Sequence, residues 1–181
     1  GYSALRLNTT GYDNIGIGVE TLDANVSGYG NTAIGLLAMS NSTTANYGTA
    51  CGRQALFSNT TGADNTAVGN YALRNNTTAG YNVAVGNGCM QSLNGANGNN
   101  TAIGHNASSG LTSGYSNVHV GLNAGDYSQT GYANVCVGMN ADQGGTGHYR
   151  EIVFGCDGVG KGNNTGYIHA SSGCYQQNNS S

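Results

Sequence analysis

The chain has 181 residues, with 32 Gly, no Pro and only 7% charged residues, against roughly 25% in an ordinary globular protein. The formal net charge is −3 and there is no basic run, so the sequence lacks the electrostatic footprint of a nucleic-acid-binding protein. No apolar stretch approaches the ~20 residues of a membrane span. Such a composition is typical of disorder unless a strict repeat organises it.

A repeat of 17 residues organises the whole chain. The motif N-x-A-[IV]-G recurs, and its final glycines are 17 residues apart except for one spacing of 18, between Gly86 and Gly104. The residue before each glycine is apolar, the residue two positions earlier is mostly β-branched, and a small residue stands between them in the first six units. This alternation predicts one short strand per repeat. In chain order the strands are centred on Gly16, Ala33, Ala50, Ala67, Ala84, Ala102, His119, Cys136, Val153 and Tyr167.

Stacking these units predicts an all-β fold, a parallel β-solenoid of about ten 17-residue coils. A second column, four residues past each glycine, is apolar up to Met90 and then loses this character at Ser108, Gly125 and Asp142. We therefore expect the cross-section to change near the 18-residue spacing. The Asn that opens most strands is expected to form amide ladders. Charges are scarce because identical positions stack on one another, where like charges would repel.

The small column is expected to face away from the core, against neighbouring copies of the chain. A thin coil has a narrow core of its own, so three chains around one axis would bury more. The alternative is that alanine is merely tolerated on an outer wall. The five cysteines form no C-x-x-C pair and are expected to be free thiols.

The sequences "NTAIG", "NTAVG" and "NVAVG" resemble the head repeats of YadA-like trimeric autotransporter adhesins, although the period here is longer. The longer form "ALxxNTTGxxNTAIG" is similar to repeats of viral and phage tail-fibre proteins. The resemblance implies a left-handed β-roll that assembles as an intertwined homotrimer. It assigns residues 1–163 to the repeats and 164–181 to an irregular C-terminal coil. The end at "QQNNSS" resembles the mature end left after a C-terminal chaperone cleaves itself off.

Two carboxylates are the candidates for catalysis. Asp126 and Asp142 lie at nearly matching positions of adjacent repeats, and a glycosidase needs two carboxylates about 5–10 Å apart. We favour the simpler interpretation, in which both accept hydrogen bonds from turn N–H groups. The chain is therefore not expected to be an enzyme or to bind a cofactor. His119, in the small column, is a weak metal candidate if one His from each of three chains met on the axis.

Tyrosines supply the candidate binding surface. Tyr12, Tyr29, Tyr115 and Tyr132 recur before the strands, and Tyr47, Tyr81 and Tyr149 are assigned to the next position. Tyrosine beside Asn and Ser suits glycan contacts, whereas the alternative is tyrosine packing over a corner of the solenoid. The predicted receptor- or glycan-binding residues, including the C-terminal ones, are Tyr115, Tyr132, Tyr149, Tyr167, His169 and Tyr175.

The predicted function is the structural and receptor-binding segment of a trimeric viral or phage tail fibre, on the virion surface, that attaches to a host glycan or protein receptor. The alternatives are a trimeric autotransporter head on the bacterial outer cell surface and an ice-binding β-solenoid. The ice-binding alternative comes from the threonine column Thr32, Thr49, Thr66 and Thr101, which valines interrupt. No nucleic acid partner and no membrane insertion are expected.

Overall fold

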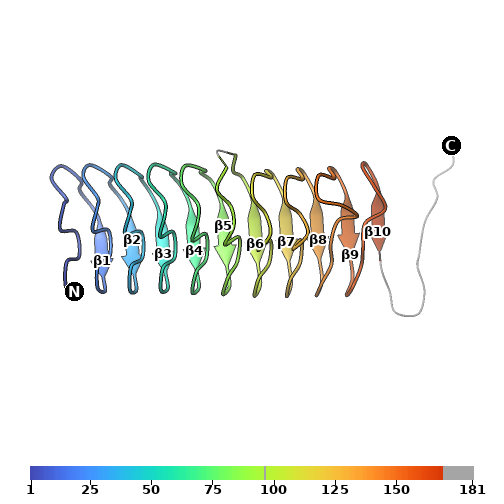
Figure 1. Cartoon of the computed structure of the whole chain (residues 1–181), viewed down its shortest axis with the longest axis horizontal. Helices are drawn as coiled ribbons and strands as arrows, with labels where there is room; N and C mark the ends of the chain where they lie inside the picture. Colours follow the sequence, from blue (N-terminus) through green and yellow to red (C-terminus); the bar gives the residue numbers. More distant parts are fainter. Residues whose placement is uncertain (96, 169–181) are drawn as a thin grey trace.

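The computed structural model describes residues 1–95 and 97–168, which form one row of stacked turns (Figure 1). Each turn contributes one three-residue strand. The ten strands are β1 (Ile15–Ile17), β2 (Thr32–Ile34), β3 (Thr49–Cys51), β4 (Thr66–Val68), β5 (Val83–Val85), β6 (Thr101–Ile103), β7 (Val118–Val120), β8 (Val135–Val137), β9 (Ile152–Phe154) and β10 (Gly166–Ile168). They pair in chain order into one parallel sheet. The prediction of an all-β parallel β-solenoid is confirmed, with about nine turns of about 17 residues.

The strand register follows the repeat without a slip. Ala67 pairs with Ala84 across the ordinary spacing, and Ala84 pairs with Ala102 across the spacing of 18, so the extra residue lies in a turn. At the C-terminal end Tyr167 of β10 pairs with Val153 of β9. β10 thus lies inside the segment predicted as an irregular coil, of which the structure describes residues 164–168.

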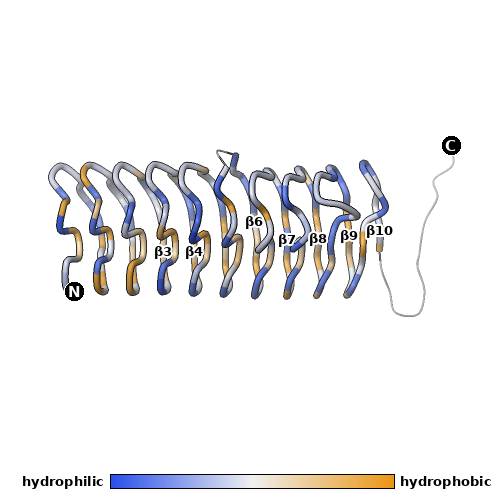
Figure 2. The backbone as a smooth tube through the Cα atoms, in the orientation of Figure 1, coloured by the Kyte–Doolittle hydropathy of each residue, from blue (hydrophilic) through white to orange (hydrophobic). Residues whose placement is uncertain are grey.

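The middle residue of each strand points into the solenoid and its two neighbours point outward, so the predicted orientation is wrong. Ala33 and Ala102 are fully buried, whereas Ile34 and Ile103 are 38% and 42% exposed. The reason is the thin coil, whose interior is already filled by large side chains from the turns. A Cβ placed on Gly16 would already contact the side chain of Leu5. Alanine therefore covers the chain's own core, and the apolar columns visible along the strands in Figure 2 face outward.

The core is built from pairs of large and small residues that exchange places along the solenoid. In the N-terminal half, turn residues such as Leu56 and Leu73 pack with the small strand residues in one buried cluster. From β7 onward the strand carries the larger side chain and the turn the smaller or polar one. These strand residues are His119, Cys136 and Val153, and the turn residues are Ser108, Gly125 and Asp142. The predicted change of cross-section is this exchange, which begins just after the spacing of 18.

Buried asparagines form the predicted amide ladder at the start of the strands. The N–H of Asn82 donates to Asn65 Oδ1 at 3.0 Å, and the N–H of Asn100 donates to Asn82 Oδ1 at 3.1 Å. In another corner the Asn76 side chain donates to Asn59 Oδ1 at 2.9 Å. Because the amide is uncharged, it can recur in every turn without electrostatic repulsion.

The glycine that closes each strand is required by the stacking. Gly52 has φ of +139°, and a Cβ on it would collide with the carbonyl oxygen of Gly69 in the next turn. A side chain at this position would push neighbouring turns apart.

The prediction of free cysteines is confirmed for Cys51, Cys89, Cys136 and Cys156, and Cys174 lies outside the described residues. Burial raises the pKa of the Cys89 and Cys136 thiols to about 12, which keeps them unreactive. Within the described ranges no helix is long and apolar enough to cross a membrane.

Candidate functional site

Three of the predicted tyrosines form a stacked column before β7, β8 and β9. Parallel backbone bridges hold Tyr115 beside Tyr132 and Tyr132 beside Tyr149. The ring centroids are 5.0 and 4.9 Å apart, and the ring planes differ by 3° and 4°. Tyr149 is in register with Tyr132, so its assignment to the next repeat position is wrong. Tyr115 is 40% exposed, and the Arg150 guanidinium lies 6.0 Å from the Tyr149 centroid, which leaves a column of aromatic rings with a cation at its C-terminal end.

A shorter tyrosine pair lies before β1 and β2. Tyr12 and Tyr29 stack with their centroids 4.8 Å apart, but Tyr47 meets Tyr29 edge-on, at 5.1 Å and 83°. Tyr47 stands one residue later in its repeat, so its ring cannot continue the parallel stack. The tyrosine surface is therefore two separate columns and not one row along the solenoid.

The C-terminal residues of the predicted site do not join the tyrosine column. Tyr167 is the middle residue of β10 and packs, partly buried, against the core cluster that contains Val153. The Lys161 ammonium lies 5.1 Å from the centroid of its ring. His169 and Tyr175 lie outside the described residues.

The two candidate catalytic carboxylates line one polar cavity of about 210 Å³, together with Asn123, Tyr127 and Asn140. Asp142 is only 4% exposed, and its two oxygens accept the N–H groups of Tyr127 and Gln143, both at 2.8 Å. Burial raises its pKa to about 6. Ser109 donates its hydroxyl proton to Asp126. These bonds to backbone and neighbouring side chains are those of turn carboxylates, the interpretation that the sequence favoured.

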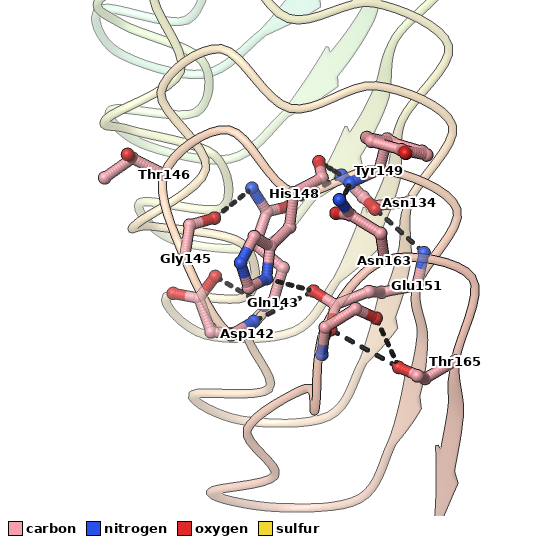
Figure 3. Close-up of polar contacts among 12 residues, drawn as sticks. Asn134, Asp142, Gln143, Gly145, Thr146, His148, Tyr149, Glu151, Asn163 and Thr165 are labelled. Atoms are coloured by element: carbon pink, nitrogen blue, oxygen red, sulfur yellow. Dashed lines mark hydrogen bonds and ion pairs between the residues drawn. The ribbon is translucent and has the colours of Figure 1, made fainter.

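Sequence reasoning missed a buried carboxylate that joins the last turns. Glu151 is fully buried at the ladder position that Asn134 occupies one turn earlier. Its Oε2 accepts the Gly144 N–H at 2.9 Å and lies 3.2 Å from His148 Nδ1 (Figure 3). Its Oε1 accepts the Gly162 N–H and, at 3.4 Å, the Thr165 hydroxyl. The signal in the sequence is the single Glu in a column of Asn.

His119 is sealed inside its own solenoid, so the predicted metal site on an axis between chains is wrong. The side chain is fully buried, and its Nδ1 lies 2.6 Å from the Ser108 hydroxyl. Its Nε2 has no hydrogen-bond partner. Among residues 1–95 and 97–168 no group of three or more His, Cys, Asp or Glu side chains could hold a metal ion.

The burial of His119 predicts a loss of stability in acid. Desolvation lowers its pKa from 6.5 to about 4 in the folded chain. The unfolded chain therefore binds more protons between these pH values, and stability falls as the pH drops from 6.5 to about 4. The expected loss from this residue is about 3 kcal/mol.

Urea unfolding across this pH range, compared between the parent chain and His119→Gln, measures the effect. The difference between the two chains is the relevant quantity, because Asp142, whose pKa is raised, contributes with the opposite sign. The variant should lose less stability on acidification. Parallel pH profiles for the two chains would contradict the prediction.

No protein-family model, curated protein sequence or solved structure matches this chain. Its function therefore has to be argued from the geometry of its own surfaces.

Proposed function

We propose that this chain is a structural and receptor-binding segment of a trimeric viral tail fibre that attaches the virion to its host cell. The observation that carries the proposal is the outward face of the sheet. The residues before the closing glycines form an apolar column along it, with exposed fractions between 37% and 57% for Ile17, Ile34, Val68, Ile103, Phe154 and Ile168. A contiguous apolar surface of this kind marks an interaction site.

Other copies of the same chain are the partner that this face fits best. The column is straight, since the strands are in register from β1 to β10, so identical chains can align along its full length. The strand residues on the face carry no charge, so chains can approach without desolvating ions. The YadA-like resemblance of the N-x-A-[IV]-G motif supports three chains and a left-handed coil.

The tyrosine column supports the adhesive part of the proposal. Stacked rings at a surface offer broad, rigid contact area for sugars at low entropic cost. Three copies of Tyr115, Tyr132 and Tyr149 on one fibre would raise the overall affinity through multivalency. A bacterial autotransporter head would present the same geometry, and the neighbouring genes separate the two origins.

Ice binding is the second candidate, favoured by the outward orientation of the threonine column. Thr32, Thr49 and Thr66 flank the buried alanines in register and reach the surface beside the apolar column. A flat, regular face of this kind could order water. Thermal hysteresis from a monomeric chain would select this function over the fibre.

The native mass of the purified chain tests the fibre proposal. Light scattering should give three times the 18.3 kDa of one chain. Ile103→Glu should dissociate this trimer, because three carboxylates would be buried at the interface without partners. Val26→Glu is the matched control, since Val26 is equally exposed, at 43%, but lies in a turn. A monomeric parent chain, or equal dissociation by both variants, would refute the proposal.

A further inference from the structure

The positive charges of this chain are distributed in an unusual way. There are 5 Lys and Arg residues, and only Arg6 forms an ion pair with a carboxylate, that of Asp23 at 2.9 Å. Each of the others lies against a tyrosine ring. Arg53 and Arg74 converge on the same ring, that of Tyr71, with their guanidinium carbons 5.4 and 5.6 Å from its centroid.

Stacked turns hold this cluster in place. Arg53 lies in the turn after β3, and Tyr71 and Arg74 lie in the turn after β4. The Tyr71 N–H donates to the Arg53 carbonyl oxygen at 3.0 Å, and Arg74 Nε donates to Gln54 Oε1 at 3.1 Å. The two guanidinium groups are thus positioned by neighbouring coils of a rigid rod, and they lie within the length of a disaccharide.

The two charges are uncompensated within the described part of the chain. Neither Arg53 nor Arg74 lies within ion-pair distance of a carboxylate there, and Arg53 donates no side-chain hydrogen bond. Arg53 is exposed, and Arg74 and Tyr71 are half-buried. Most of the guanidinium N–H donors therefore remain available to an anion from solution.

We propose that Arg53, Tyr71 and Arg74 bind an acidic polysaccharide through the carboxylates of its uronic acid residues. A guanidinium matches a carboxylate with two parallel hydrogen bonds, and a tyrosine ring packs on the apolar face of a sugar. Two arginines flanking one ring suit an anionic group on either side of one pyranose. Nucleic acid fits less well, because the chain has a net charge of −3 and no basic run.

This inference deepens the attachment function proposed above by naming the chemical class of the receptor. Both arginines lie in turns and not on the apolar strands, and the whole cluster belongs to one chain. The site therefore does not need the trimer in order to bind, although a trimer would present it three times.

Calorimetric titration of the full chain at low salt, with three uronate oligosaccharides as probes, tests the inference. The probes are short oligomers of galacturonate, of mannuronate and of hyaluronan, and a carboxyl-reduced galacturonate oligomer is the neutral match. We expect at least one uronate probe to bind and its neutral match not to bind. Arg53→Gln and Arg74→Gln should each weaken binding by about tenfold. Arg6→Gln removes the same charge from an arginine already paired with Asp23 and should change nothing.

Four results would overturn the inference: no binding of any uronate probe, equal binding of the neutral oligomer, equal affinity of the Arg53 and Arg74 variants, or an equal loss in Arg6→Gln. Tighter binding of duplex DNA or of a sulfated oligosaccharide would also overturn it, since it would indicate unspecific attraction of polyanions. Light scattering on the same samples keeps the two proposals apart. A monomer that binds uronate would refute the fibre alone, and a trimer that binds none would refute the uronate site alone.

Discussion

Ser108→Leu alone is expected to destabilise the solenoid by about 3 kcal/mol, and adding His119→Ala is expected to recover most of that loss. The single change forces a leucine into space already filled by the His119 ring, whose Nδ1 lies 2.6 Å from the Ser108 hydroxyl. The double change recreates the pairing of the N-terminal turns, in which a turn leucine packs on a strand alanine. Leucine also suits the backbone, since Leu56 and Leu73 have φ of +52° and +50° and Ser108 has +55°.

Equilibrium unfolding of the parent, the two single variants and the double variant measures this coupling. His119→Ala alone should also be costly, because it leaves a cavity and removes the buried partner of the Ser108 hydroxyl. Amide exchange in β6 and β7 would show whether the damage is local, as expected where each turn contacts only its neighbours. Strictly additive losses in the double variant would contradict the size exchange as the basis of the core.

The repeat predicted the fold because register and stacking repeat with it. One glycine column, one alternating triplet and the Asn before it sufficed to place all ten strands and the amide ladder. The direction of the side chains was not predictable in the same way. Alternation shows that Ala50 and Cys51 face opposite sides, but either side could have been the core. The turn leucines decided the matter, since they fill the interior and leave room only for alanine.

The candidate site was harder to predict because it depends on contacts between turns. The column of Tyr115 and Tyr132 follows from equal repeat positions, and the one-residue offset of Tyr47 breaks the other column. Glu151 was overlooked because an acidic residue in a polar turn suggests a solvated side chain. Its burial depends on His148 and on N–H groups from two loops, none of which the local sequence reveals.

Glu151→Ala is expected to open the last turn of the solenoid, with a local loss of about 3 kcal/mol. The carboxylate accepts the N–H of Gly144 in one loop and the N–H of Gly162 in the next, so its removal leaves both donors without an acceptor in a buried site. Thr165 loses a partner as well, and Thr165 accepts at its carbonyl the N–H of Ile152 in β9. Amide exchange in β10 should accelerate by about 100-fold, while exchange in β1 to β6 should stay unchanged.

Two further variants separate the clamp from the ladder. Glu151→Asn restores the residue type of the ladder, and its N–H still donates to Asn134 Oδ1, but its shorter side chain cannot reach Gly144 and Gly162 together. It should therefore open β10 nearly as much as Glu151→Ala. Asp64→Asn removes a carboxylate from an exposed turn and should have no effect on exchange in β10. If Glu151→Asn exchanged as slowly as the parent chain, continuity of the ladder would hold the last turn, and the carboxylate would be dispensable.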